Sequence, residues 1–196
     1  MEECQFCRKL IGTQNNAVNS RKPAEELKKE RSRKRLGRDQ QHTLWIRGGA
    51  GIFKNIWSND NYAQDGLYLS DTNKPGRMYM MSIEHHSEVE VRLDRVQNWA
   101  FISLQTEDAY LNDFTTSIIC DHCEDCLFTN LFEYRMQSFE VPFPYAIRLN
   151  QCRWMSFWGV HAYSGGPNPW ENAALLVESG GMVKDREIGT LLVNHG

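Results

Sequence analysis

The sequence contains no long hydrophobic run and no large excess of charge. No apolar stretch approaches the roughly 20 residues that a membrane-spanning helix needs, so we expect no membrane segment. Residues 1–10 are polar and lack the apolar core of a signal peptide, so the printed chain predicts no export signal. The 196 residues are 41% hydrophobic and 24% charged. That balance is typical of one folded domain and argues against a disordered chain.

The small net charge of −3 hides two parts of opposite sign, because residues 1–41 carry +5 and residues 42–196 carry −8. Within the basic part, residues 23–36 begin with proline, continue with glutamates and end with basic residues, which favours a short helix. This segment has almost no apolar stripe. We therefore interpret residues 1–41 as a solvated arm, helical or disordered. The alternative, which we favour less, is a contact with nucleic acid or another anionic polymer.

From residue 42 onward the chain is β-rich and repeats itself. Three segments superpose without a gap, at residues 91–107, 118–134 and 147–163, and looser copies lie near Leu44, Leu67 and Leu175. The same residue class recurs in each column: Val91, Ile118 and Ile147; Leu93, Cys120 and Leu149; Val96, Cys123 and Cys152; Trp99, Cys126 and Met155; Phe101, Phe128 and Phe157; Leu104, Leu131 and Val160. Apolar side chains alternate within each segment, as strands with one buried face require. The repeat predicts an all-β fold, a parallel β-helix of at least four coils over residues 42–196.

Six cysteines raise the question of a metal site. Cys120, Cys123 and Cys126 together with the Cys4-x-x-Cys7 pair resemble zinc ligands at first sight. However, the first three and Cys152 fall in the apolar columns, and free cysteine packs well as a small hydrophobe. We therefore predict that these four are buried thiols without a metal, and we expect no cofactor. Cys4 and Cys7 stay unassigned.

The outward-facing positions after the last apolar column carry the residues that could do chemistry. We expect one outward row of Glu84, Gln105, Phe132 and His161, and a second row, two residues further along, of His86, Glu107, Tyr134 and Tyr163. Aromatic faces, amides and carboxylates are the groups that bind sugars. In this alignment the backbones of Glu84 and Glu107 lie roughly 8 Å apart, inside the ~6.5–9.5 Å range of inverting glycosidases. We expect His85 to point inward. The alternative is a solvated polar face without a catalytic role.

At these residues the sequence resembles glycoside hydrolase family 55, the β-1,3-glucanases or laminarinases. The resemblance covers about residues 43–193 and is strongest at two motifs, Ser-Ile-Glu-His-His ending at His86 and Leu-Gln-Thr-Glu ending at Glu107. It implies a right-handed, pectate-lyase-like parallel β-helix, a secreted enzyme, and hydrolysis with inversion and no metal. It also implies that Glu107 is the general acid and that Glu84 is a second carboxylate. Gln105, His86, Tyr134, His161 and Tyr163 would then contact the substrate.

The resemblance covers only the second of the two β-helices that family members place side by side. The first β-helix, which lines the other side of the cleft, has no counterpart in residues 1–41. We therefore expect the chain to carry the general-acid half of a β-1,3-glucan site, with little activity alone. A separate N-terminal half or self-association would complete the cleft. The alternatives are a non-catalytic β-glucan-binding or scaffold β-helix, and a zinc-containing nucleic-acid-binding protein.

Overall fold

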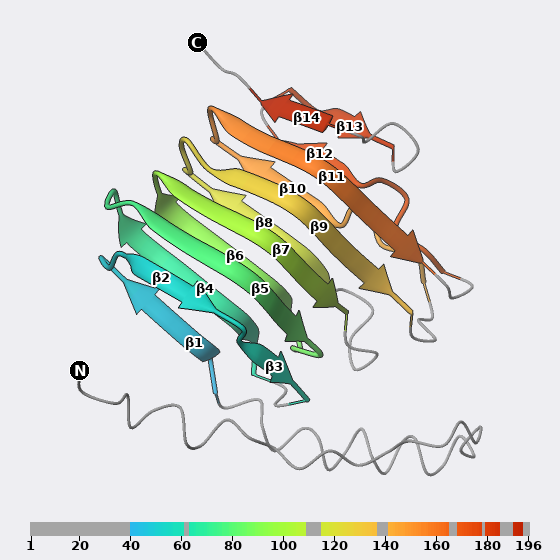
Figure 1. Ribbon diagram of the computed structural model, residues 1–196. Helices are drawn as coiled ribbons and strands as arrows, with labels where there is room; N and C mark the ends of the chain where they lie inside the picture. The colour runs from blue at the N-terminus through green and yellow to red at the C-terminus, as the bar shows by residue number, and fades with distance from the viewer. Residues whose placement is uncertain are drawn as a thin grey trace.

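The computed structural model describes residues 40–60, 63–108, 115–136, 141–164, 168–177, 179–184 and 190–193. Most of the predicted basic arm, with Cys4 and Cys7, lies outside these residues. Every regular element in the described part of the chain is a β-strand (Figure 1). Within that part there is accordingly no helix with the length and apolarity to cross a membrane.

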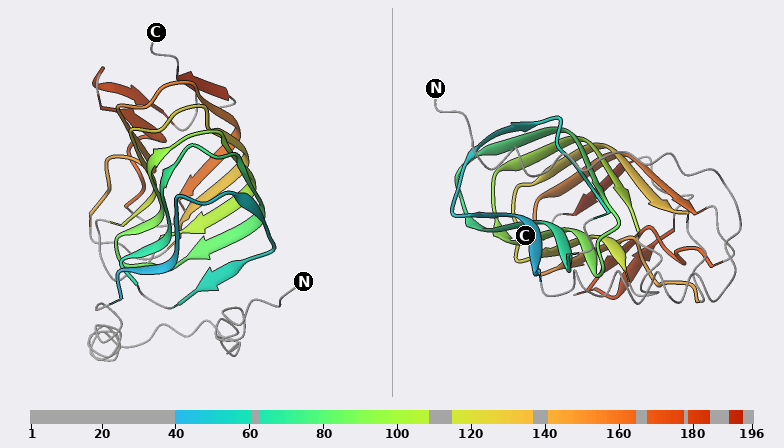
Figure 2. Two further views of the ribbon diagram at one scale, coloured as in Figure 1. Left: turned by 90° about the vertical axis from the view of Figure 1, so that its left-hand side faces the viewer. Right: turned by 90° about the horizontal axis from the view of Figure 1, so that it is seen from below.

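Two parallel sheets face each other across one core, and the chain passes from one to the other in every coil (Figures 1 and 2). The first sheet runs in the order β1 (His42–Arg47), β4 (Asp65–Thr72), β6 (Val89–Val96), β8 (Thr116–Asp121), β10 (Ile147–Asn150) and β12 (Ala174–Leu176). The second contains β2 (Gly51–Lys54), β5 (Gly76–Glu84), β7 (Trp99–Glu107), β9 (Leu127–Arg135) and β11 (Met155–Ser164). β3 (Trp57–Asn59) also pairs with β5, while β13 (Gly181–Val183) and β14 (Thr190–Val193) add antiparallel strands at the last coil. The prediction of a parallel β-helix is confirmed, with about five turns.

The core consists of the predicted columns stacked in register. Phe101, Phe128 and Phe157 are paired across β7, β9 and β11 and are completely buried. Their rings stack with centroids 4.6 Å and 4.8 Å apart and are nearly parallel. Like side chains in successive coils therefore form a continuous ladder, because each coil can bury its inward face only against its neighbours.

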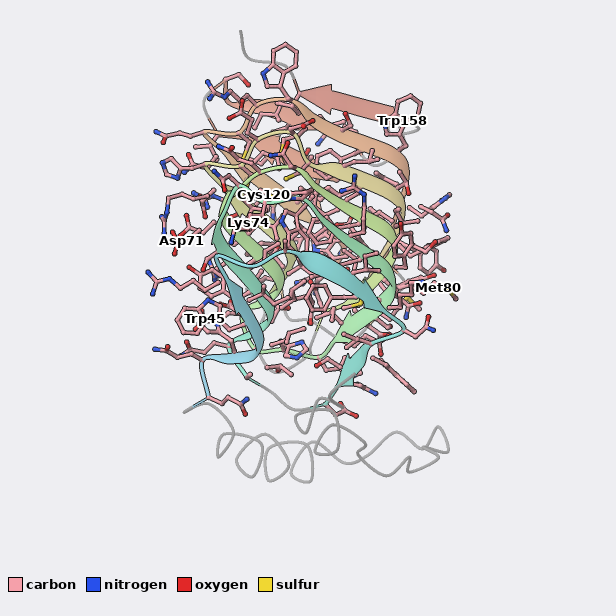
Figure 3. All side chains as sticks on the ribbon, turned by 60° about the vertical axis from the view of Figure 1, so that its left-hand side comes forward. Trp45, Asp71, Lys74, Met80, Cys120 and Trp158 are labelled. Carbon is pink, nitrogen blue, oxygen red and sulfur yellow. The ribbon has the colours of Figure 1, made fainter. Side chains whose placement is uncertain are left out.

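The four cysteines of the repeats lie inside this core as unpaired thiols, as predicted for their burial; Figure 3 labels Cys120. Burial raises the pKa of Cys120 to about 11 and that of Cys126 to about 12. The pKa of Cys123 is raised first by its contact with Cys120 and then by burial, and the pKa of Cys152, in the next coil, is raised by its contact with Cys123 and by burial. These thiols are therefore protonated at neutral pH and behave as core residues.

One column of residues bends the second sheet. Asn55, Met80, Ser103, Asn130 and Gly159 occupy equivalent positions in five successive strands or strand ends, and all have a φ between 52° and 62°. This left-handed conformation interrupts the alternation of side chains, so Phe101 and Leu104 both face inward although they are three residues apart. Beyond the bend the ends of β5, β7, β9 and β11 present a second outer face. The candidate functional residues lie on that face.

Candidate functional site

The outer face beyond the bend carries two rows of side chains in register. One row contains Ser82, Gln105, Phe132 and His161, and the next contains Glu84, Glu107, Tyr134 and Tyr163. The predicted offset of Glu84 from Glu107 is therefore wrong: the two glutamates are direct neighbours in adjacent coils, with backbones about 4.8 Å apart. The slip was an even number of residues, so the predicted face was correct and only the row was not.

Glu84 is nearly buried and its carboxylate is held by three donors. Oε1 accepts hydrogen bonds from Gln105 Nε2 at 2.7 Å and from the Ser82 hydroxyl, and Oε2 accepts one from Trp57 Nε1 at 3.2 Å. The predicted proximity of Gln105 and Glu84 is thus present, but as a direct bond between them. Three donors fix the direction of this carboxylate.

Glu107 is more exposed than Glu84 and faces a histidine. Its Oε1 lies 3.5 Å from His85 Nε2, and the opposite ring nitrogen, Nδ1, is 2.8 Å from Asp60 Oδ1. Burial acts against the charged form of His85, but the hydrogen bonds and charges of Asp60 and Glu107 outweigh it and raise its pKa to about 10. The prediction that His85 points inward is wrong: this face presents an imidazolium between two carboxylates.

His86, which we predicted as a substrate contact, lies inside the β-helix. Its ring is completely buried, with Nδ1 bonded to Glu90 and Nε2 3.1 Å from Ser58 Oγ. Burial, followed by the charge of His85, lowers the pKa of His86 to about 4. The reversal has a local cause. His85 has a φ of 63°, which turns its own side chain outward and the next one inward.

Aromatic side chains continue the face beyond the carboxylates. Phe132 and His161 stack with ring centroids 4.8 Å apart, and Tyr134 meets Tyr163 edge to face at 6.4 Å. His161 and Tyr163 are exposed, whereas Tyr134 is half-buried next to Glu107. The structure therefore brings together six of the seven predicted site residues, all except His86.

A buried polar layer lies behind this face. Arg135 Nη1 and Asp108 Oδ2 form an ion pair of 3.1 Å, and neither side chain is exposed. Glu133, whose strand position pairs with Thr106, is completely buried and neither of its carboxyl oxygens has a hydrogen-bond partner in the described part of the chain. Burial and the charge of Asp108 raise the pKa of Glu133 well above its usual value. This layer faces the interior and offers nothing directly to a ligand on the outer wall.

Sequence reasoning missed Asp60, His85, Trp57 and Ser82 as members of the site. The Ser-Ile-Glu-His-His motif did contain two of them, but alternation assigned the wrong histidine to the surface. Trp57 begins the short strand β3 and Asp60 directly follows that strand, and no repeat column indicated the register of β3 against β5. In the described ranges, no group of three or more His, Cys, Asp or Glu side chains is arranged to hold a metal ion.

Comparison of the chain with protein-family models, with curated proteins and with solved structures found no match. The functional argument therefore depends on the face itself. Its two neighbouring carboxylates, imidazolium, amide and four aromatic or imidazole rings form a surface with polar and apolar parts side by side. Such a surface can hydrogen-bond hydroxyl groups while packing against the C–H face of a sugar ring.

Proposed function

We propose that residues 42–196 act on β-1,3-glucan as part of an inverting glycoside hydrolase, with Glu107 as the general acid. The observation that supports this most is the in-register pairing of Glu84 and Glu107 on one outer face, beside Tyr134. Glycoside hydrolysis requires a carboxylic acid that protonates the leaving oxygen and a second carboxylate nearby. The family resemblance at the same two glutamates supports the choice of substrate.

The roles follow from the different surroundings of the two carboxylates. Glu107 is the more exposed, so it is the one that can reach a glycosidic oxygen. Glu84 already accepts from Gln105, Ser82 and Trp57, so it positions a hydroxyl or a water instead of transferring a proton. The separation of roughly 8 Å that favoured inversion is replaced by about 4.8 Å in the observed register. Inversion is therefore supported by the family resemblance alone.

A second candidate is a β-glucan-binding β-helix without turnover. The favouring observation is that both carboxylates lie on one wall, in adjacent coils of the same sheet. Inverting enzymes place acid and base on opposite sides of the scissile bond. If no second wall is supplied, the described face would bind glucan through Tyr134, Tyr163 and His161 without cleaving it.

Reducing-sugar release from laminarin separates the two candidates. We expect slow release by the purified chain, and a fall of about 10²–10⁴-fold in Glu107→Gln, the usual contribution of general acid catalysis. Glu171→Gln removes an exposed carboxylate that belongs to neither row of this face and serves as the matched control, with unchanged release. Retarded migration of the chain in a gel that contains laminarin, without any release of reducing sugar, would favour the binding protein. Release that is equal in both variants would contradict the role of Glu107.

A further inference from the structure

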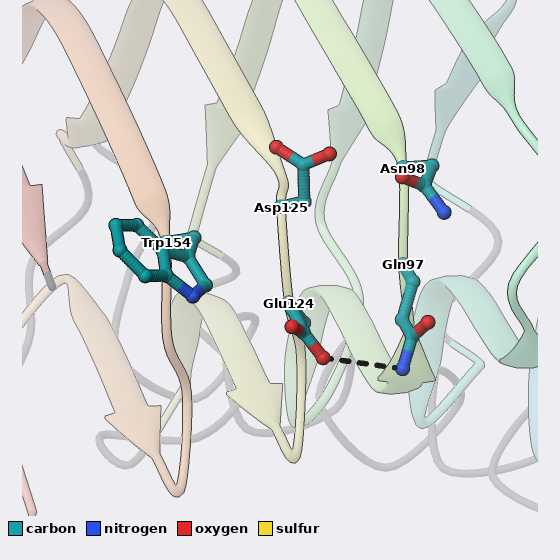
Figure 4. Close-up of a pocket in the computed structure, with 5 residues that line it drawn as sticks. All are labelled: Gln97, Asn98, Glu124, Asp125 and Trp154. Carbon is teal, nitrogen blue, oxygen red and sulfur yellow. Dashed lines mark hydrogen bonds between the residues drawn. The ribbon is translucent and has the colours of Figure 1, made fainter. Parts of the chain in front are cut away.

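A hollow on the β-helix lies away from the candidate site, at the opposite ends of the same strands. It encloses about 350 Å³ and is lined by Gln97, Asn98, Glu124, Asp125 and Trp154 (Figure 4). Gln97 and Asn98 immediately precede β7, whereas Gln105 and Glu107 lie at its end. Nine residues separate Asn98 from Glu107, a path of up to roughly 30 Å along an extended strand. The hollow is therefore a separate place on the surface.

The lining residues come from three successive coils at equivalent turn positions. Gln97, Glu124 and Arg153 form one column of bridges, and Asn98, Asp125 and Trp154 form the next. The second column has a left-handed backbone, with φ values of 62°, 51° and 55°. Asparagine and aspartate tolerate this conformation, but a bulky tryptophan rarely adopts it. Trp154 is nevertheless placed there with half of its surface exposed. Core packing does not account for such a tryptophan.

The polar groups of the hollow differ in how many hydrogen bonds they already make within the protein. Glu124 is oriented by Arg153 Nη2 at 2.9 Å and by Gln97 Nε2 at 3.4 Å. Asn98 uses its amide nitrogen on the carbonyl of Asn73, at 3.0 Å. The carboxylate of Asp125 makes no hydrogen bond within the described ranges. The oriented carboxylate of Glu124 and the available carboxylate of Asp125 thus lie beside the exposed indole of Trp154.

We infer that this hollow is a second saccharide-binding site, which takes one or two pyranose units of a neutral glycan. The C–H face of a pyranose ring would pack on the indole of Trp154, and its hydroxyls would donate to Asp125 and to the side-chain oxygen of Asn98. The volume is at the lower end of the ~300–1,000 Å³ typical of small-ligand sites, which suits a single short stretch of sugar. The identity of the glycan, β-1,3-glucan, rests on the proposed function.

A cationic ligand fits the hollow less well. Recognition of quaternary ammonium groups uses a cage of several aromatic rings, and Trp154 is the single aromatic lining residue. In addition, Arg153 offsets the charge of Glu124. A neutral ligand with many hydroxyl groups uses what the hollow offers, and a cation does not.

Fluorine NMR of the chain labelled with 5-fluorotryptophan tests this site, because six tryptophans give six signals. Trp154→Phe and Trp57→Phe assign the two signals of interest. Trp57 donates to Glu84 and so reports on the candidate active site. Trp158, which is exposed on the outer face of β11, reports non-specific binding. Laminarihexaose and tetramethylammonium chloride are titrated separately, up to about 20 mM, beyond the millimolar affinities expected of such a small site.

We expect laminarihexaose to shift the Trp154 signal saturably, with an affinity about tenfold weaker in Asp125→Ala, where a charge-assisted hydrogen bond is lost. An unmoved Trp154 signal, a shift unaffected by Asp125→Ala, or a Trp158 shift with the same midpoint would overturn the inference. So would a response to tetramethylammonium alone. If laminarihexaose shifts the Trp154 signal but not the Trp57 signal, the second site is supported and the proposed function is contradicted. If it shifts the Trp57 signal but not the Trp154 signal, only the second site is contradicted.

Discussion

Glu133 is a carboxyl group that the fold buries without a hydrogen-bond partner among the described residues. Its raised pKa means that the folded protein favours the protonated form more than the unfolded chain does. Stability from such a group is therefore complete below the unfolded pKa and is lost as pH rises toward the folded value. Glutamine, an uncharged side chain of the same shape, would not lose this stability as pH rises.

We predict that Glu133→Gln is more stable than the wild type at pH 8 and close to it at pH 4. The difference in the free energy of unfolding should grow by up to about 1.4 kcal/mol for each pH unit between the two pKa values. Urea unfolding at a series of pH values measures it. Glu171→Gln changes an exposed glutamate in the same way, and its difference in unfolding free energy from the wild type should not depend on pH. If the difference for Glu133→Gln is also independent of pH, the carboxyl of Glu133 is ionised in the folded protein.

The two adjacent histidines show what alternation alone can and cannot predict. Strand periodicity correctly placed Glu84, Gln105, Glu107 and the tyrosines outside. It failed at His85 because one left-handed residue reverses the side of every residue that follows. Histidine tolerates that conformation better than most residues, but nothing in the sequence requires it there. The contact of His85 with Asp60, 25 positions earlier, depends on tertiary structure.

At the scale of strands, spacing between coils decided which rows were predicted correctly. The segments 91–107, 118–134 and 147–163 superpose without internal gaps, and every predicted core column in them is confirmed by the register. The preceding coil is shorter, with 23 residues from Glu84 to Glu107 against 27 from Glu107 to Tyr134. The shortening lies in the turns, where no apolar column marks the register. The row containing Glu84 was consequently placed two residues out.

The bend column also contains one residue that its backbone does not suit. Met80 has a φ of 52° and an exposed side chain (Figure 3), whereas asparagine occupies the same column at Asn55 and Asn130. An unbranched apolar side chain gains nothing there to offset the roughly 1–2 kcal/mol cost of left-handed backbone. Asparagine reduces that cost because its short polar side chain bonds locally.

We predict that Met80→Asn stabilises the protein by about 0.5–1 kcal/mol, measured as a higher urea midpoint with an unchanged slope. Met136→Asn is the matched control, since Met136 is an exposed methionine whose φ is not positive. It should give no gain. Equal effects of the two substitutions would show that surface polarity, and not the bend, causes the change.

Across the whole molecule, stability passes from coil to coil through the aromatic ladder. Each repeat of a solenoid contacts mainly its neighbours, so the free energy of folding is close to a sum of repeat and interface contributions. Phe128 lies in the middle, stacked on Phe101 at 4.6 Å and on Phe157 at 4.8 Å. A change there weakens two interfaces of the buried ladder at once, whereas a change on the outer wall leaves that ladder intact.

We predict that Phe128→Leu lowers the free energy of unfolding by about 2–3 kcal/mol, from lost volume and two lost ring contacts. Phe132→Leu makes the same chemical change four residues later, on the outer face where Phe132 meets His161, and should cost less than about 1 kcal/mol. Hydrogen exchange locates the effect: amides of β7, β9 and β11 should lose protection together, because the strands on both sides share the weakened rungs. Loss confined to β9 would mean that the coils are stabilised independently, and that the ladder fills space without coupling them.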